Sequence, residues 1–270
     1  MGRETAMTAD QPGVARRQVL QGVLQGLGGL PLAAVLANPA LAQAAAETLT
    51  DVTIETADGR SVSGALALPE TLPAPAVIAI HEWWGLNDQI KTVTAEFARQ
   101  GYVALAVDLY DGVVADTRER ASALVRSIDD IEATETMAAW VDWLRAHEAT
   151  TGRLGTVGWC FGGGWSLNTA IAAPVEACVI YYGRCDRPAE AMARLQGPVL
   201  GHFATQDGYI DAAMVDRFAD AMNAAARSYT VHWYEADHAF ANPTGARYDA
   251  ADAQLAWART LDFLGRHLRA

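Results

Sequence analysis

The chain has 270 residues, of which 51% are hydrophobic and 19% are charged, and its formal net charge is −12. This length and apolar content suit one globular domain with a sizeable buried core, and they argue against bulk disorder. The negative charge argues against a nucleic-acid partner, which requires a basic surface.

The first part of the chain has the three regions of a secretory signal. A basic pair stands at residues 16–17, an apolar run rich in Leu, Ala and Gly covers residues 19–37, and a small-x-small sequence ends at Ala42. The arginine pair before a mildly apolar run resembles a twin-arginine signal, which exports folded proteins. An uncleaved membrane anchor is the alternative, but glutamines and glycines make the run a poor membrane span. We therefore predict a cleaved twin-arginine-like signal over residues 1–42 and a periplasmic or secreted mature chain.

The mature chain, residues 43–270, begins with two stretches, 50–56 and 62–68, in which apolar and polar residues alternate. These predict an antiparallel pair at a sheet edge. Buried strands are predicted over 76–80, 102–107, 155–159, 177–182, 199–203 and 230–234. Helices are predicted over 90–99, twice within 117–148, and over 161–173, 211–225 and 249–268.

Continuous apolar strands that alternate with helices indicate a mostly parallel sheet with helices on both faces. No repeat and no second-domain linker is visible in the sequence. The pattern therefore predicts a single doubly wound α/β domain over residues 43–270. Active sites in such sheets lie outside the carboxyl ends of the strands, so reactive residues are expected there.

Cys160 stands between a predicted strand and a predicted helix, in a G-x-C-x-G sequence that runs from Gly158 to Gly162. A nucleophile elbow requires this context, and its tight turn requires small residues on both sides of the nucleophile. The helix dipole at this position favours thiolate over thiol. The backbone N–H of Phe161 would point at the oxyanion that forms during acyl transfer. A buried structural cysteine is the alternative, which the strand–turn–helix context disfavours.

His238 and Asp207 also follow predicted strands. His238 lies in the loop after the last strand, where a general base would take the thiol proton and later give it to the leaving alcohol. Asp207 could orient the imidazole and stabilise its cation. The chain order of nucleophile, acid and base is that of α/β-hydrolases. The alternative for His238 is a surface loop residue, and the alternative for Asp207 is an ordinary turn. Asp237 is a competing acid, but it adjoins the histidine in sequence and cannot easily reach round to it.

The sequence His81-Glu82-Trp83-Trp84-Gly85 follows the strand predicted over 76–80. The second oxyanion donor of this fold comes from that loop, so the backbone N–H of Trp83 is the candidate. Glu82 would lie near the thiol, where a carboxylate could hydrogen-bond the neutral thiol at rest. A solvated loop charge is the alternative for Glu82.

These residues together resemble the dienelactone hydrolase family, also called carboxymethylenebutenolidases, of the α/β-hydrolase superfamily. The matching pieces are HEWWGL (81–86), DLY (108–110), GWCFGGG (158–164), YYG (181–183), QDG (206–208) and HWYEADHAF (232–240). An elbow cysteine with an upstream Glu and the ordered Asp and His is specific to this family among α/β-hydrolases. The resemblance implies a monomeric, cofactor-free hydrolase in which Glu82 contacts the cysteine until substrate binds.

The chain departs from the family at two positions. The dienelactone-cleaving enzymes carry one arginine two residues after the DLY tyrosine and another four residues after the catalytic histidine, and these clamp the substrate carboxylate. Gly112 and Asn242 stand there in this chain, and neither can replace a bidentate clamp. Arg118, Arg184 or Arg247 could reach in from elsewhere. We therefore do not expect dienelactone itself to be the substrate.

Aromatic residues are frequent in the matching segments and predict a largely apolar substrate pocket, with core packing as the alternative for each. The candidate pocket residues are Trp84, Tyr110, Tyr181, Phe240 and Asn242. The three cysteines include no Cys-x-x-Cys pair, and no His/Cys cluster has zinc-ligand spacing, so no metal site is predicted. Cys178 is predicted to be a small core residue.

Taken together, the residues predict a hydrolase that cleaves a small ester or lactone through a Cys–His–Asp triad and an acyl-enzyme. No cofactor, nucleic acid or membrane span is expected after signal cleavage. A broad carboxylesterase without lactone preference, or a non-catalytic binding protein on the same fold, is the alternative.

Overall fold

The computed structural model describes residues 30–269, and its strands form one eight-stranded sheet in the order β1-β2-β4-β3-β5-β6-β7-β8. The strands are β1 (Thr50–Glu55), β2 (Ser61–Ala67), β3 (Ala74–Ile80), β4 (Val103–Val107), β5 (Thr150–Trp159), β6 (Ala177–Tyr181), β7 (Val199–Ala204) and β8 (Tyr229–Tyr234). β2 runs antiparallel to both β1 and β4, and every other pairing is parallel. The predicted fold class is confirmed, and so is the antiparallel pair at the sheet edge.

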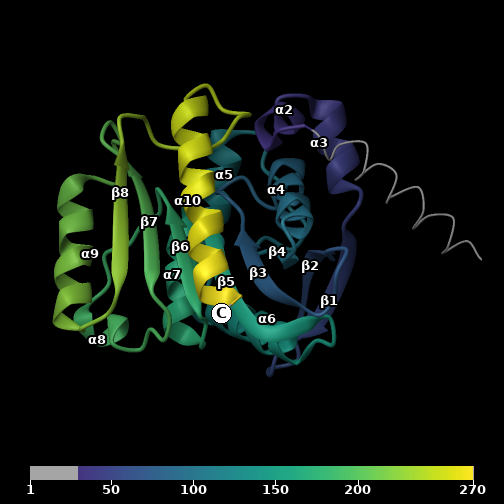
Figure 1. The fold of residues 1–270 in the computed structure, drawn as a ribbon, viewed down its shortest axis with the longest axis horizontal. Coiled ribbons are helices and arrows are strands. Elements are labelled where there is room, and N and C mark those ends of the chain that lie inside the picture. Colours follow the sequence, from purple (N-terminus) through teal and green to yellow (C-terminus); the bar gives the residue numbers. More distant parts are fainter. Residues whose placement is uncertain (1–29, 270) are drawn as a thin grey trace, which may run out of the picture.

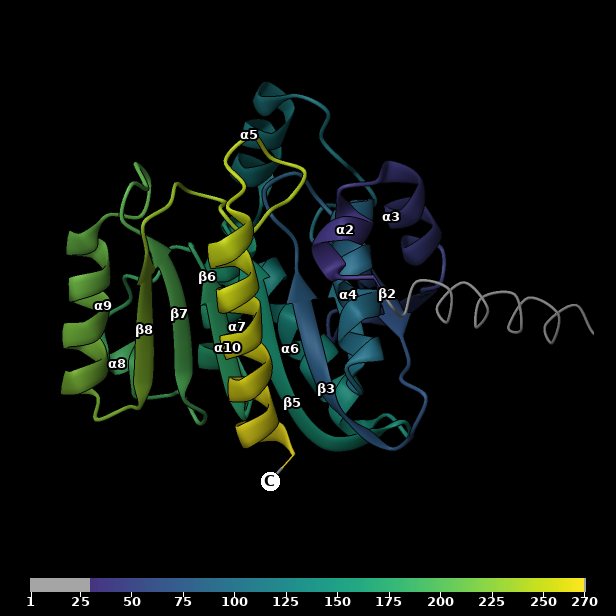
Figure 2. The ribbon, with the colours of Figure 1, turned by 45° about the horizontal axis from the view of Figure 1, so that its top comes forward.

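Helices cover both faces of the sheet (Figure 1). They are α2 (Leu32–Leu36), α3 (Pro39–Ala46), α4 (Asp88–Arg99), α5 (Arg118–Ser127), α6 (Asp130–Ala146), α7 (Phe161–Ala172), α8 (Ala189–Met192), α9 (Ala212–Ala224) and α10 (Ala250–Leu268). Apolar side chains of α4 and α10 pack on one face, and those of α6, α7 and α9 pack on the other. The segment before α10 and helix α5 lie beyond the carboxyl ends of the central strands (Figure 2).

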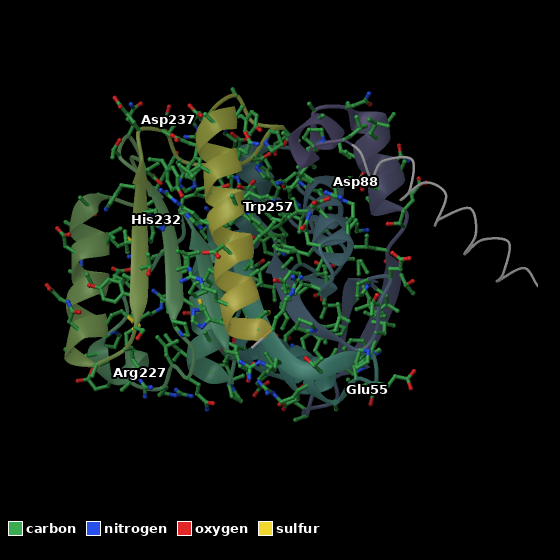
Figure 3. The ribbon with its side chains drawn as sticks, viewed as in Figure 1. Glu55, Asp88, Arg227, His232, Asp237 and Trp257 are labelled. Atoms are coloured by element: carbon green, nitrogen blue, oxygen red, sulfur yellow. The ribbon has the colours of Figure 1, made fainter. Side chains whose placement is uncertain are left out.

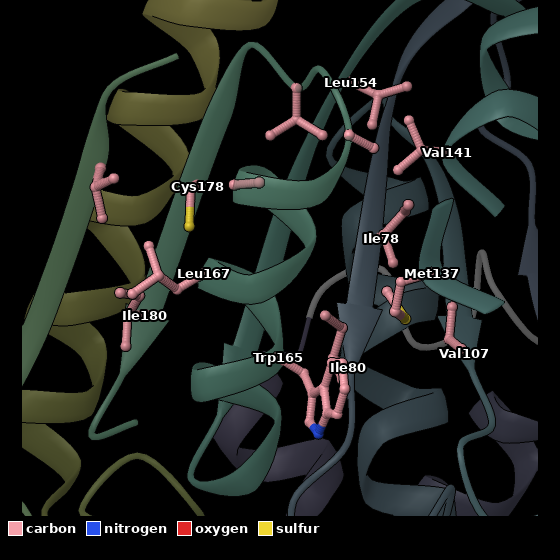
Figure 4. Close-up of a cluster of buried hydrophobic side chains, with 14 of the residues drawn as sticks. Ile78, Ile80, Val107, Met137, Val141, Leu154, Trp165, Leu167, Cys178 and Ile180 are labelled. Carbon is pink, nitrogen blue, oxygen red and sulfur yellow. The ribbon is translucent and has the colours of Figure 1, made fainter. Parts of the chain in front are cut away.

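The central strand β3 shows why its sequence is apolar throughout. Ile78 and Ile80 point to the face that α6 and α7 cover, where they meet Met137 and Trp165 (Figure 4). Val77, next to Ile78 in the strand, points to the opposite face, because successive strand side chains alternate. Both faces are buried, so neither set can be polar. Cys178 lies in the same cluster as Ile78 with 1% of its surface exposed, which confirms its prediction as a core residue.

The helices begin where short polar side chains cap them. Each capping oxygen accepts a hydrogen bond from a backbone N–H in the first turn, as helix N-caps do. In the five longer capped helices after residue 80, the caps are Asn87, Thr117, Asp129, Asp211 and Asp249. These caps explain why the predicted helix boundaries agree closely with the structure.

Three parts of the fold were not predicted. β5 begins at Thr150 rather than Gly155, because its polar first residues extend the pairing with β3 past an irregularity near Ala74. The short helix α8 was missed. Helix α2 and the first half of α3 lie within the predicted signal, whose arginine pair is outside the described residues. Ala42 lies in α3, where its carbonyl oxygen accepts a hydrogen bond of 2.9 Å from the Thr92 hydroxyl of α4.

Aromatic packing joins the helices on the outer side of one sheet face. Trp257 of α10 lies against Phe97 of α4, with ring centroids 4.7 Å apart (Figure 3). Across residues 30–269, no helix combines the length and the hydropathy needed to cross a membrane.

Candidate active site

The turn that carries Cys160 joins β5 to α7 and has an unusual backbone. Cys160 has φ +54° and ψ −117°, a conformation that L-residues rarely adopt. A Cβ at Gly158 would overlap the carbonyl of Gly162, and a Cβ at Gly162 would overlap the carbonyl of Ile80. The turn therefore requires glycine on both sides of the cysteine. The Cys160 N–H is held by the carbonyl of Tyr181 at 3.0 Å.

The structure brings Cys160, His238 and Asp207 together from the loops after β5, β8 and β7. Nε2 of His238 lies 3.1 Å from Sγ of Cys160, and Nδ1 lies 2.7 Å from Oδ2 of Asp207. An ionised carboxylate can only accept hydrogen bonds, so Nδ1 carries the ring proton and donates a hydrogen bond to Asp207. The lone pair of Nε2 is then free to accept the thiol proton. The three side chains form one hydrogen-bonded chain.

Asp207 is held as an anion by the groups around it. Burial opposes its ionisation, but the hydrogen bond and charge of His238 and two backbone N–H groups outweigh that effect and keep the pKa of Asp207 below its usual value. Those N–H groups belong to Tyr209 and Ile210, which donate to Oδ1 at 2.7 and 3.0 Å. The competing acid, Asp237, is exposed at the periphery (Figure 3), so the structure favours Asp207.

The half-buried thiol of Cys160 is protonated at neutral pH, because burial and then the nearby Glu82 carboxylate raise its pKa to about 12. Hydrogen bonds from the backbone N–H groups of Phe161 and Trp83 to the sulfur lower the pKa of Cys160 and partly offset this rise. The expected preference for thiolate at the helix end is therefore present but is outweighed. Both backbone groups predicted as oxyanion donors therefore lie close to the sulfur.

Glu82 is a buried carboxylate with two neutral donors. Asn242 donates from Nδ2 to Oε2 at 2.6 Å, and the Tyr182 hydroxyl donates to Oε1 at 3.4 Å. Burial raises the pKa of Glu82, although these bonds and the charges of His238 and Arg247 partly offset the effect. The resting thiol bonds His238 rather than Glu82, which differs from expectation. Glu82 acts on the sulfur through its charge.

Asn242 has a fixed orientation, which the sequence could not reveal. Its Oδ1 accepts hydrogen bonds from the backbone N–H of Thr244 at 3.0 Å and from the Thr244 hydroxyl at 2.7 Å. Nδ2 must therefore face Glu82. Of the three arginines considered for a carboxylate clamp, Arg184 pairs with Asp186 at 3.2 Å, whereas the exposed Arg247 is near enough for its charge to act on Glu82.

His81 is a site residue to which the sequence analysis assigned no role. It is fully buried, and burial lowers its pKa, so the ring is neutral. Nδ1 donates to the carbonyl of Glu82 at 2.6 Å, and the backbone N–H of Leu109 donates to Nε2 at 3.2 Å. His81 thus ties the loop that carries Glu82 and Trp83 to the loop after β4. Its place directly after β3, next to Glu82, was the available signal.

Two predicted pocket residues are wrong. Tyr181 is 1% exposed, and its hydroxyl lies 2.6 Å from that of Thr260 in the core. Phe240 is fully buried between the rings of Tyr182 and Tyr234. Tyr181 still belongs to β6 and points to the core, whereas Tyr182, at φ +38°, leaves the strand and contacts Glu82.

The other two predicted pocket aromatics, Trp84 and Tyr110, belong to one small cluster of packed side chains that also includes Phe161, the residue after Cys160. Trp84 is half-buried, with its ring centroid 4.9 Å from that of Trp83. Tyr110 is 5% exposed and lies 5.5 Å from the Phe161 ring. Burial and the neighbouring Cys160 raise the pKa of Tyr110. Within the described part of the chain, no group of three His, Cys, Asp or Glu side chains is placed to hold a metal ion.

Known proteins similar to this chain indicate its family. A family model described as "Dienelactone hydrolase family" matches residues 62–268. The carboxymethylenebutenolidase of Pseudomonas putida is 29% identical over 224 residues, which cover 79% of this chain and 94% of that protein. A Bradyrhizobium protein described as "Probable 2-oxo-3-(5-oxofuran-2-ylidene)propanoate lactonase" is 32% identical over 209 residues, covering 72% of this chain and 84% of that protein.

A solved structure of a dienelactone hydrolase-like promiscuous phosphotriesterase from metagenomic libraries matches with a TM-score of 0.74 at 24% identity, covering 81% of this chain and 98% of that chain. This likeness shows the shared fold. The family match spans the elbow, the loops of Asp207 and His238, and the segment around Glu82. The chain is therefore a hydrolase that belongs to the dienelactone hydrolase, or carboxymethylenebutenolidase, family of α/β-hydrolases.

Proposed function

We propose that this hydrolase cleaves a small ester or lactone through a thioester acyl-enzyme formed on Cys160. The observation that carries the proposal is the continuous hydrogen-bonded chain from Asp207 through His238 to the sulfur. A glycine-flanked elbow presents that sulfur to two backbone N–H groups. Acyl transfer needs a nucleophile, a base and an oxyanion site within reach of one another, and this arrangement supplies all three.

In the first half-reaction, His238 takes the thiol proton as Sγ of Cys160 attacks the carbonyl carbon. Proton transfer must accompany attack, because the resting thiol has a pKa of about 12. The N–H groups of Trp83 and Phe161 stabilise the oxyanion, and Asp207 stabilises the imidazolium. Collapse of the intermediate breaks the bond to the alcohol oxygen, which receives the proton from Nε2 of His238.

In the second half-reaction, water replaces the alcohol at the same face of the thioester. His238 takes a proton from this water, which attacks the acyl carbon, and the sulfur leaves as the thiol is restored. An ester gives separate alcohol and acid products. A lactone gives one hydroxy acid, because its alcohol stays attached to the acyl group.

Glu82 has a protective role in this proposal. Its charge disfavours the thiolate of Cys160, and the thiolate is the form of cysteine that oxidants and electrophiles attack. The free enzyme would therefore hold an unreactive thiol until a carbonyl carbon lies beside the sulfur.

Hydrolysis of p-nitrophenyl acetate tests the proposal. Cys160→Ala should lower kcat/KM by about 1,000-fold or more, because the nucleophile is lost. Cys178→Ala, which removes a thiol from the core, should retain activity. The intact mass of wild-type protein quenched during turnover should show one added acyl group that Cys160→Ala lacks.

Equal, slow release of nitrophenol by wild type and Cys160→Ala would contradict the proposal and favour a non-catalytic binding protein. If wild type is active, parallel panels of esters and lactones separate a lactone-preferring enzyme from a broad carboxylesterase.

We also propose that the chain is exported, with cleavage near Ala42, and that the mature protein is a monomer. The basic pair and apolar run of residues 1–42 support export. Cleavage at this position would divide α3, so α3 must leave α4 before processing. N-terminal sequencing of the exported protein tests the cleavage site, and light scattering of the purified protein tests its oligomeric state.

A further inference from the structure

Tyr209 is an exposed aromatic residue beside His238, the proposed general base. It lies on the loop between β7 and α9, and 67% of its surface is exposed. Its ring centroid is 5.1 Å from that of His238, at an interplanar angle of 65°. Its backbone N–H donates to Asp207, so the carboxylate that orients the imidazole also fixes this part of the loop.

A second tyrosine packs on the same imidazole but is closed to solvent. The ring of Tyr182 lies 5.2 Å from that of His238, and the residue is fully buried. Tyr182 can support His238 but has no free surface for a substrate. Tyr209 contacts the imidazole with a ring that remains free to bind another group.

The direction of the reaction places the leaving alcohol near this ring. The alcohol oxygen must receive its proton from Nε2 of His238, which is 3.1 Å from the sulfur. The group bonded to that oxygen therefore lies next to the imidazole. A flat aromatic group there can pack against the Tyr209 ring, and such ring pairs have favourable contact energies beyond the buried area.

We propose that Tyr209 is a specificity-determining residue whose ring packs against the alcohol portion of the substrate and favours aromatic over small aliphatic alcohols. For lactones, the same contact favours a ring fused to an aromatic group. This inference rests on the proposed ester or lactone hydrolysis, and Tyr209 takes no part in the bond changes.

The test compares two esters with one acyl group, benzyl acetate and ethyl acetate, on the purified full chain. Tyr209→Ala and Tyr209→Leu should lower kcat/KM for benzyl acetate by about 2- to 12-fold, the range expected for one aromatic pair. Their kcat/KM for ethyl acetate should stay within about 2-fold, because the backbone contact to Asp207 remains. Tyr209→Phe keeps the ring and should behave as wild type.

Trp233→Leu is the matched control, because Trp233 is an exposed aromatic residue on β8 that packs on Phe203 and not on the imidazole. It should leave the benzyl-to-ethyl ratio unchanged. An unchanged ratio in Tyr209→Ala, whether both rates fall together or neither falls, overturns the inference while the proposed function stands. If the wild-type chain hydrolyses no ester or lactone, the proposed function fails, and this inference fails with it.

Discussion

Asp207 and Glu82 are two buried carboxylates beside the same imidazole and thiol, yet their pKa values shift in opposite directions. Burial disfavours the ionised form of both side chains and so raises both pKa values. Asp207 overcomes the penalty because it bonds His238, a ring that can carry charge, and two backbone N–H groups. Glu82 does not, because its hydrogen-bond donors are the neutral Asn242 and Tyr182. The hydrogen-bond partners of these two buried carboxylates therefore decide the direction in which each pKa shifts.

The largest expected effect is on kcat and concerns Asp207. An asparagine at Asp207 can donate to Nδ1 and so stabilises the wrong tautomer of His238. Asp207→Asn should lower kcat for p-nitrophenyl acetate by about 1,000- to 10,000-fold. Asp237→Asn is the control, because Asp237 is exposed and should be replaceable without effect. A loss below about 10-fold in Asp207→Asn would show that the carboxylate is dispensable.

The second prediction concerns the effect of the Glu82 charge on the Cys160 thiol. Glu82→Gln removes the charge that disfavours the Cys160 thiolate, so the pKa of Cys160 should fall. Alkylation of Cys160 by iodoacetamide near neutral pH should become about 10-fold faster, since the thiolate is the reactive form. The rate is measured by peptide mass spectrometry, with the buried Cys178 as an internal control. A slower alkylation of Cys160 would contradict the role assigned to Glu82.

The third prediction concerns the donor that holds Glu82. Asn242→Leu leaves a buried carboxylate oxygen without its amide partner, which should cost about 1–3 kcal/mol in the free energy of unfolding. Thr244→Ala removes one of the two bonds that orient the amide and should cost less. Urea denaturation measures both. Equal stability of Asn242→Leu and wild type would show that the Glu82–Asn242 bond contributes nothing.

The smallest expected effect is on the pH dependence of the free energy of unfolding. The pKa of Glu82 is raised in the folded chain, so its contribution to stability is present below the ordinary value of 4.5 and is lost as pH rises through the folded value. Asp207 has a lowered pKa, so its contribution is present above 3.8 and is lost as pH falls.

Denaturation of wild type and Glu82→Gln at pH values below and above 4.5 measures the contribution of Glu82 to the free energy of unfolding. The stability of Glu82→Gln relative to wild type should increase as pH rises above 4.5. A relative stability that stays constant with pH would mean that Glu82 has an ordinary pKa in the folded chain.

The sequence predicted the parts of the molecule that local rules govern. The elbow at Cys160 follows from its flanking glycines, and the places of Asp207 and His238 follow from the strand ends. The bond between Glu82 and Asn242 joins residues 160 positions apart, which no local pattern relates. The protonation of the thiol depends on burial, which is a property of the folded chain alone.

The choice between Tyr181 and Tyr182 shows the same limit on a smaller scale. Two adjacent tyrosines at a strand end look alike in sequence, and the end of the strand decides which one bonds Thr260 and which one contacts Glu82. β6 ends at Tyr181, and the positive φ of Tyr182 directs the second ring to Glu82 and His238.

The shape of the elbow is independent of the atom that it presents. Its shape is set by main-chain atoms and by the absence of side chains at Gly158 and Gly162, and no part of that shape depends on the sulfur itself. The position can therefore carry oxygen or selenium without a new backbone arrangement. Exchange of that single atom would compare nucleophiles of different acidity and polarisability against one unchanged imidazole.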